Sequence, residues 1–256
     1  MKTIILCGGK GTRLREETEY KPKPMVEIGG RPIIWHIMSL YARAGFKDFV
    51  LPLGYKGEVI KDYFFHFKAM NSDFTVDLGT GDIRTYNGCN CSDWRVTLSD
   101  TGQETYKGAR IKRIAKYIDT DRFMVTYGDG VADVDLAKLI AFHKDSDAVG
   151  TFTGVRLPSR FGAVSTADDG RILSWQEKPV LNEYINGGFF VFKREFLDYL
   201  WEDDDCDLEK EPLERLAAEG KLNMYRHDGF WQCMDTYRDY TKLNALWDAG
   251  QAPWVK

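Results

Sequence analysis

The feature of this sequence that most constrains its fold is a glycine-rich segment that directly follows a short apolar run near the start. Ile4 and Ile5 are typical of a buried strand, and Gly8, Gly9 and Gly11 come soon after them. Backbone N–H groups at the end of such a strand can turn towards an anion, because glycines carry no Cβ atoms that would block the approach. The segment therefore predicts a strand followed by a phosphate-binding loop, and a polyphosphate is the expected ligand.

Two basic side chains strengthen this interpretation, since Arg13 and Lys23 add full positive charge close to the loop. Two familiar phosphate-binding patterns do not fit. The dinucleotide fingerprint requires a third glycine where Leu14 stands, and the P-loop requires Ser or Thr where Gly11 follows Lys10. A third pattern remains, and its predicted nucleotide-binding residues are Leu6, Cys7, Gly8, Gly9, Lys10, Gly11, Thr12, Arg13 and Lys23.

Composition excludes several classes of protein. The 256 residues carry a formal net charge of −4 and no basic tract, which argues against a nucleic acid polymer as partner. No apolar segment is long enough to span a membrane or to form the core of a signal peptide, so we expect no membrane partner and a cytoplasmic protein. The five cysteines form an odd set and are expected to be reduced, with Cys89 and Cys91 an incidental pair in a loop.

Strand and helix patterns alternate along most of the chain. Strands are predicted at 49–53, 95–98, 123–126, 148–155, near 163, 172–175 and 189–192, and helices at 32–44, 59–67, 111–118, 136–143, 212–218 and 237–249. The alternation predicts an α/β fold with a Rossmann-like, mostly parallel mixed sheet flanked by helices and a smaller β-rich part. We expect one domain over 1–256, in which 1–147 mainly binds the nucleotide. Residues 68–94 interrupt the pattern and read as a hairpin or excursion that covers substrate or contacts another subunit.

Two aspartates stand where ligands can be held. Asp129 follows the strand predicted at 123–126, and the carboxyl ends of parallel strands are where open α/β sheets bind ligands. Between two glycines, however, an aspartate is more often a turn residue. Asp235 precedes the last predicted helix, where it could equally serve as a helix cap.

The pattern Gly-Gly-x-Gly-Thr-Arg-Leu followed by Pro-Lys-Pro resembles the signature of the sugar-1-phosphate nucleotidylyltransferases, which join a sugar phosphate to a nucleotide and release pyrophosphate. The resemblance extends over nearly the whole chain. It is carried by the segments 25–30, 54–57, 100–102, 127–130, 160–163, 177–179, 186–190 and 229–232. Cys7 replaces the alanine that is more usual in the first motif, a change that we expect to be tolerated.

The resemblance implies roles for individual residues. Asp129 and Asp235 would bind Mg²⁺ beside the α-phosphate, and Arg13 and Lys23 would join them as catalytic residues. Thr101, Arg110 and Gly128 would contact the nucleotide, although Arg110 could also belong to a basic helix that faces solvent. The predicted sugar-phosphate-binding residues lie in the half 148–256 and are Glu177, Lys178, Asn186 and Gly187.

Within the family the segments look like the cytidylyl branch, which implies CTP and glucose 1-phosphate as substrates and a homo-oligomer as the assembly. A phosphate acceptor is already a nucleophile, so no Ser/His/Asp set is needed. Alternatives stay open: a thymidylyl- or uridylyltransferase acting on a sugar 1-phosphate, a glycosyltransferase that consumes a nucleotide sugar, or a non-catalytic homologue that senses nucleotide.

Overall fold

One mixed sheet forms the centre of the molecule. The computed structural model describes residues 1–9, 11–86, 93–159 and 161–255, and within them eight strands pair in the order β13-β10-β14-β8-β1-β4-β7, with β15 also pairing with β10. The strands are β1 (Lys2–Leu6), β4 (Asp48–Leu53), β7 (Arg95–Asp100), β8 (Arg122–Tyr127), β10 (Gly150–Val155), β13 (Ile185–Asn186), β14 (Phe190–Lys193) and β15 (Leu222–His227). Neighbouring strands run parallel except where β14 and β13 meet β8 or β10, which confirms the mostly parallel mixed sheet.

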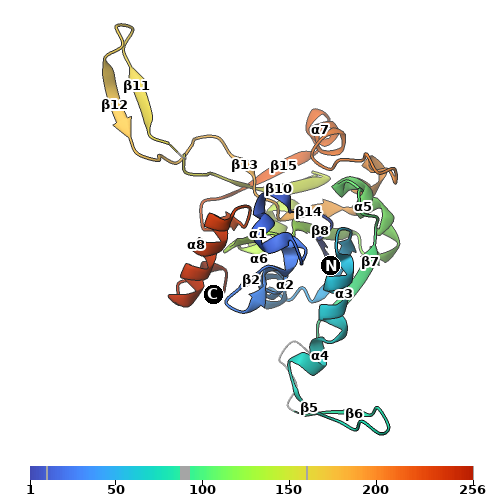
Figure 1. Ribbon diagram of the computed structural model, residues 1–256. Helices are drawn as coiled ribbons and strands as arrows, with labels where there is room; N and C mark the ends of the chain where they lie inside the picture. Colours follow the sequence, from blue (N-terminus) through green and yellow to red (C-terminus); the bar gives the residue numbers. More distant parts are fainter. Residues whose placement is uncertain (10, 87–92, 160, 256) are drawn as a thin grey trace.

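Helices cover both faces of this sheet (Figure 1). They are α1 (Arg15–Thr18), α2 (Ile33–Arg43), α3 (Gly57–Phe65), α4 (Phe67–Met70), α5 (Lys107–Arg113), α6 (Leu136–Lys144), α7 (Glu211–Ala218) and α8 (Tyr237–Asp248). Short 3₁₀ helices are η1 (Thr12–Leu14), η2 (Lys23–Met25), η3 (Ala115–Tyr117), η4 (Arg194–Tyr199) and η5 (Pro253–Val255).

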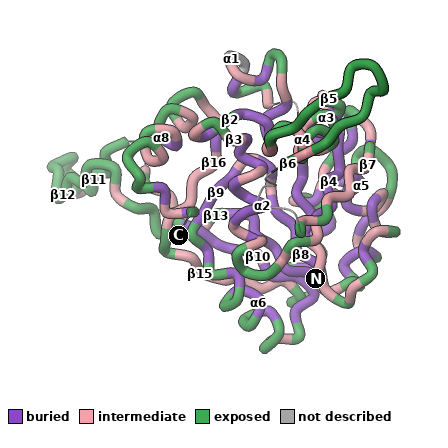
Figure 2. Tube along the Cα trace, turned by 90° about the horizontal axis from the view of Figure 1, so that it is seen from below, coloured by how far each residue is buried: buried purple, intermediate pink, exposed green. Residues whose placement is uncertain are grey.

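The core divides into two clusters because successive side chains of a strand point to opposite faces of the sheet. In β1, Ile5 packs with α2 and α6, whereas Ile4 packs on the other face with α5 and α7. The same alternation holds in β4, where Phe49 and Leu51 belong to the first cluster and Val50 to the second. Buried central strands are apolar on both sides for this reason, and Figure 2 shows them as the buried interior.

Most predicted elements are present with shifted ends. The helix predicted at 111–118 begins earlier, as α5 at Lys107, and closes as η3. The sequence reading missed β15, which runs parallel to β10 along its whole length. None of its residues is fully buried and Arg226 is exposed, so Leu222–His227 lacks the apolar signal of the inner strands.

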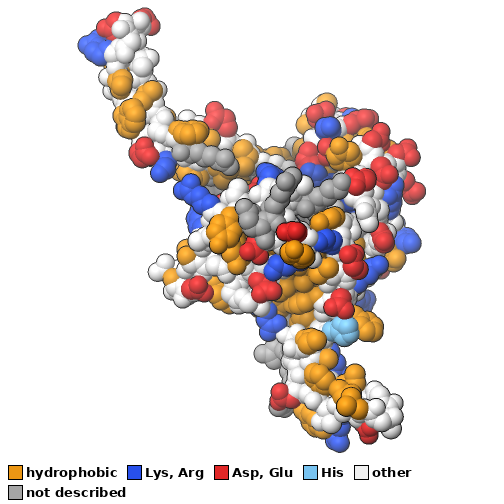
Figure 3. Space-filling model, in the orientation of Figure 1, with side chains coloured by type: hydrophobic (Ala, Val, Ile, Leu, Met, Phe, Trp, Pro, Cys, Tyr) orange, Lys and Arg blue, Asp and Glu red, His pale blue; other side chains and the backbone are white. Residues whose placement is uncertain are grey.

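Two antiparallel hairpins project from opposite sides of the body (Figure 1). One consists of β5 (Asp73–Val76) and β6 (Ile83–Tyr86), which confirms the predicted hairpin within 68–94, and the other of β11 (Ala163–Thr166) and β12 (Ile172–Gln176). Large apolar side chains lie exposed on both projections, as Figure 3 shows. Two further small sheets pair β2 (Glu27–Ile28) with β3 (Arg31–Pro32) and β9 (Gly130–Ala132) with β16 (Trp231–Cys233).

Candidate active site

A cleft of about 510 Å³ opens where β1 and β8 end, at the carboxyl edge of the sheet. It is lined by the glycine loop, by η2, by the turn after β8, and by residues before α7 and after β16. The predicted residues that line it are Leu6, Cys7, Gly8, Gly9, Gly11, Thr12, Arg13, Lys23, Arg110, Gly128, Asp129, Asn186, Gly187 and Asp235. Lys10 lies outside the described residues, as do Cys89, Cys91 and Arg160.

Asp129 and Asp235 meet at one ammonium group. Lys23 Nζ lies 2.6 Å from Asp129 Oδ2 and also donates a hydrogen bond to Asp235 Oδ1. The small sheet between β9 and β16 aligns the two aspartates, since Met234 N donates to Asp129 O over 2.8 Å. On the outer side, Arg13 NH1 lies 2.8 Å from Asp235 Oδ2. Two carboxylates and two cations therefore converge beside the glycine loop.

Asp235 is not the N-cap of α8, because its neighbour takes that position. Thr236 is the N-cap of α8, and it forms a capping box with Asp239, whose carboxylate accepts from the Thr236 N–H over 2.9 Å. This satisfies the first turn of the helix. The Asp235 carboxylate is therefore left to face Lys23 and Arg13 in the cleft.

Neighbouring charges determine the protonation states of Lys23 and Asp235. Burial lowers the pKa of the Lys23 ammonium, but Asp129 and Asp235 raise it by more, so that the pKa lies above its usual value. Burial raises the pKa of Asp235, yet Lys23 and Arg13 outweigh it and hold the pKa below its usual range. Lysine and carboxylate are therefore both charged at neutral pH.

The Arg110 side chain packs against the glycine loop. Its guanidinium is buried, and it donates to Gly8 O over 3.3 Å, to Leu53 O over 2.8 Å and to the Thr101 hydroxyl over 2.8 Å. The alternative that Arg110 faces solvent is wrong. A Cβ atom on Gly8 would lie 2.1 Å from Arg110 Cζ, so any larger residue there would have to displace this guanidinium.

Thr101 does not line the cleft, because its hydroxyl donates to Leu53 O over 2.7 Å and accepts from Arg110. Gly128 does, and it lets β8 approach β1 closely, since a Cβ atom there would meet Leu6 O at 2.6 Å. Both positions therefore shape the loop, and of the two only Gly128 lies at the cleft surface.

The predicted sugar residues separate into two groups. Asn186 and Gly187 lie in the cleft, at its β13 end. Glu177 and Lys178 lie outside it, directly after β12 at the base of the projecting hairpin, where their side chains are 63% and 57% exposed and 3.5 Å apart. The structure therefore does not bring Lys178 to the two aspartates.

The cleft also contains residues that sequence reasoning missed. Tyr127 ends β8 and Lys107 begins α5, while Glu209 precedes α7; all three line the cleft. Thr105, Tyr106, Phe189 and Trp231 line it as well. Tyr127 carried a usable signal, because it stands immediately before Gly128 and Asp129 at a strand end. Glu209 carried none, since it lies among many acidic residues between 202 and 214.

The cleft offers hard oxygen ligands rather than a nucleophile. Burial raises the pKa of the Cys233 thiol to about 12, and burial likewise raises that of Cys7, so neither is a thiolate at neutral pH. Asp129 and Asp235 already hold one cation between them, and two carboxylates with phosphate oxygens and water suit Mg²⁺. The described residues contain no group of three or more His, Cys, Asp or Glu that could hold a metal without such help.

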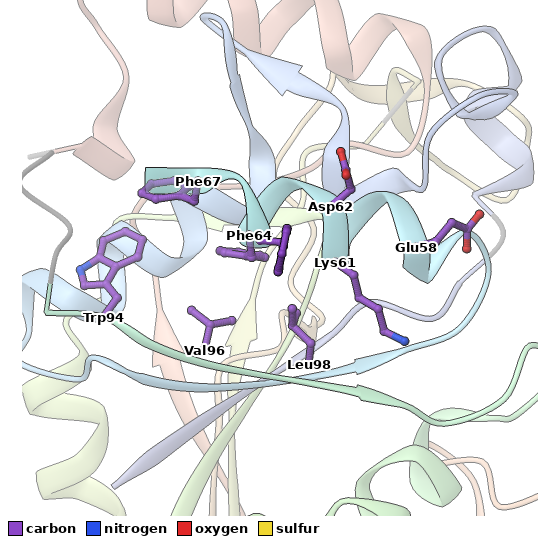
Figure 4. A pocket seen from close by; sticks show the side chains of 9 residues that line it. Glu58, Lys61, Asp62, Phe64, Phe67, Trp94, Val96 and Leu98 are labelled. Atoms are coloured by element: carbon purple, nitrogen blue, oxygen red, sulfur yellow. The ribbon is translucent and has the colours of Figure 1, made fainter. Parts of the chain in front are cut away.

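A second, larger cavity of about 730 Å³ lies away from the cleft, between α3 and β7 (Figure 4). Phe64 and Phe67 face Trp94, Val96 and Leu98 across an apolar groove, while charged side chains from α3 stand at its rim. The groove has no polar constellation suited to phosphate chemistry.

Among the described residues, no helix combines the length and apolar character needed to cross a membrane.

Known proteins resemble this chain over nearly its full length. The family model described as nucleotidyl transferase matches residues 2–252. A glucose-1-phosphate cytidylyltransferase of Salmonella typhi is 47% identical, with 99% of this chain and 98% of that protein covered. A probable glucose-1-phosphate cytidylyltransferase of Bacillus subtilis is 42% identical, with 99% of each covered.

A solved structure shares the fold. The crystal structure of HddC from Yersinia pseudotuberculosis superimposes with a TM-score of 0.71 at 24% identity, covering 96% of this chain and 99% of that chain. Together with the cleft at the end of β1, these similarities confirm the resemblance that the opening loop indicated. The chain belongs to the nucleotidyl transferase family, together with the glucose-1-phosphate cytidylyltransferases with which it shares nearly half of its residues.

Proposed function

We propose that this protein transfers the cytidylyl group of CTP to α-D-glucose 1-phosphate and releases pyrophosphate, forming CDP-glucose. The observation that carries the proposal is the meeting of Asp129 and Asp235 at Lys23 beside the glycine loop. Curated relatives with 47% and 42% identity bear the name of this activity and support the choice of CTP. A thymidylyl- or uridylyltransferase would share the same phosphate chemistry.

In this reaction the chain's residues position and stabilise rather than form a covalent bond. The glycine loop and Arg13 hold the triphosphate, and Lys23 offsets the negative charge that grows on the phosphoryl oxygens and leaving pyrophosphate. The acceptor phosphate attacks the α-phosphorus in line with the departing pyrophosphate. Mg²⁺, when bound by Asp129 and Asp235, would supply further charge neutralisation at the α-phosphate.

The sugar phosphate enters from the other end of the cleft. Asn186 and Gly187 contact the sugar there, and residues 148–256 supply this half of a single domain whose 1–147 half binds the nucleotide. Glu177 and Lys178 stay predicted ligands of the sugar phosphate. They reach it only if the β11–β12 hairpin changes position relative to the body or if a second copy supplies them.

The deciding experiment measures pyrophosphate release with each of the four nucleoside triphosphates and several sugar 1-phosphates. Release with CTP and glucose 1-phosphate, with at least a tenfold preference over UTP and dTTP, is expected. Preference for UTP or dTTP would assign the protein to a sister activity. Consumption of CDP-glucose without pyrophosphate release would indicate a glycosyltransferase, and nucleotide binding without turnover a sensor.

We also propose that the protein assembles with copies of itself in the cytoplasm. Isolated two-stranded hairpins are marginally stable in water, yet both projections expose large apolar side chains. Leu78 is 93% exposed on one, and Leu173 and Trp175 are 63% and 65% exposed on the other. The apolar groove beside α3 adds a surface close to the first hairpin. A second copy would cover these surfaces and support the hairpins.

A further inference from the structure

A chain of hydrogen bonds joins four side chains in the wall of the cleft. Asn186 Nδ2 donates to the Tyr127 hydroxyl over 2.8 Å, and that hydroxyl donates to Glu209 Oε1 over 2.7 Å. Lys107 Nζ donates to the same carboxylate oxygen and lies 5.5 Å from the centre of the Tyr127 ring. All four side chains line the cleft, and they come from four separate parts of the chain.

Only one oxygen of the Glu209 carboxylate accepts hydrogen bonds. Oε1 accepts from both Tyr127 and Lys107, whereas Oε2 is buried and has no hydrogen-bond partner among the described residues. A buried carboxylate oxygen without a donor is costly, because desolvation is not compensated. The Glu209 side chain is nevertheless 29% exposed as a whole and lies at the cleft. Oε2 itself is covered in this conformation, so a ligand donor reaches it once the carboxylate turns towards the cleft that Glu209 lines.

We propose that Glu209 Oε2 accepts a hydrogen bond from a hydroxyl group of the sugar 1-phosphate, and so selects the sugar. The inference rests on the proposed function. Tyr127 ties Glu209 to Asn186, which places the carboxylate at the sugar end of the cleft. A carboxylate repels phosphate, so the partner is a neutral donor of the kind that sugars carry in abundance.

Lys107 and Tyr127 act as positioning residues in this arrangement. The ammonium of Lys107 balances the carboxylate charge without occupying Oε2, and the Tyr127 hydroxyl anchors Oε1. Burial first, and then the neighbouring Glu209 charge, raise the pKa of Tyr127, so that its hydroxyl stays a donor. A site with a fixed acceptor discriminates strongly against an analogue that lacks the donor, because the acceptor is then left unpaired.

The test compares wild type with Glu209→Ala on glucose 1-phosphate and on its 2-, 3-, 4- and 6-deoxy analogues, using kcat/KM for pyrophosphate release. We expect one deoxy analogue to be about 10- to 100-fold poorer than glucose 1-phosphate with wild type. The same analogue should be nearly as good as glucose 1-phosphate with Glu209→Ala, since the acceptor is gone. Glu209→Leu, which keeps most of the side-chain bulk but has no acceptor oxygen, serves if Glu209→Ala does not fold.

Tyr127→Phe is the matched control, because it removes the neighbouring hydroxyl but leaves Glu209 Oε2. It should lower kcat/KM and yet keep the discrimination between analogues. Equal discrimination by wild type and both Glu209 variants would refute the inference. The same comparison is made with CTP and 2′-deoxy-CTP. If wild type discriminates against 2′-deoxy-CTP and Glu209→Ala does not, the donor is the ribose hydroxyl, which also overturns the inference. A wild type that releases no pyrophosphate refutes the proposed function itself, which distinguishes the two failures.

Discussion

Asp129 and Asp235 accept hydrogen bonds from the same ammonium group, that of Lys23, although they follow different strands of different sheets. The pairing of β9 with β16 makes this possible, since it fixes the separation of the two carboxylates. Two negative charges and one positive charge therefore lie together at one place in the cleft.

Replacement of either aspartate by alanine should lower turnover with CTP and glucose 1-phosphate by about a hundredfold or more, the effect of losing one preorganised transition-state contact. Steady-state pyrophosphate release measures this. Asp135→Ala is the control, because this carboxylate caps α6 away from the cleft and accepts from Lys138 N over 3.0 Å: it should cost about 1 kcal/mol of stability and leave kcat nearly unchanged. Near-normal turnover in both Asp129→Ala and Asp235→Ala would refute the assignment.

Gly8→Ala should destabilise the protein by about 2 kcal/mol, since the new Cβ atom would displace the Arg110 guanidinium from the loop carbonyls. Gly9→Ala is a matched control, because a Cβ atom there meets nothing within 4 Å. Its free energy of unfolding in urea should stay within about 0.5 kcal/mol of wild type. Equal unfolding free energies for the two variants would contradict the proposed packing of Arg110 under Gly8.

Lys178→Ala should raise the KM for glucose 1-phosphate by about tenfold through loss of a charge-assisted contact with phosphate, while the KM for CTP changes little. Initial rates at varied glucose 1-phosphate measure this. Arg171→Ala, another exposed cation on the same hairpin, provides the comparison. An unchanged KM and kcat in Lys178→Ala would remove this lysine from the site.

Stability should fall as the pH is lowered from 7.5 to 5, because His143 is buried beside Thr151 and burial lowers its pKa to about 4. The unfolded chain takes up a proton near pH 6.5 and the folded chain near 4, so stability is lost within this window. The loss at pH 5 is about 2 kcal/mol. Urea unfolding at both pH values should show a smaller loss of unfolding free energy in His143→Gln than in wild type. The exposed-site variant His66→Gln should lose as much as wild type.

Leu173→Asp should shift the protein to a smaller particle in light scattering coupled to size-exclusion chromatography, since it places a charge in the proposed contact surface of the β11–β12 hairpin. Ser174→Asp introduces the same charge on the opposite face of β12 and should leave the particle size unchanged. A wild type that is monomeric at micromolar concentration would contradict self-association through this hairpin.

The local part of the site could be predicted from sequence because its chemistry is contiguous. A glycine loop must follow its strand directly in order to turn N–H groups towards a ligand, so Gly8, Gly9 and Arg13 were recognisable together. Apolar periodicity likewise predicted α2 and α6, where one helix face is buried. It failed for β15, whose residues are not fully buried and show no clear alternation.

Tertiary structure alone decided which distant residues meet. Whether Asp235 caps α8 or faces the cleft depends on Thr236 taking the cap, and whether Arg110 faces solvent depends on how α5 packs under the glycine loop. The contact between Tyr127 and Glu209, and the exclusion of Lys178 from the cleft, likewise follow from the path of the chain in space. Sequence records spacing along the backbone, whereas these relationships depend on distances across it that only packing determines.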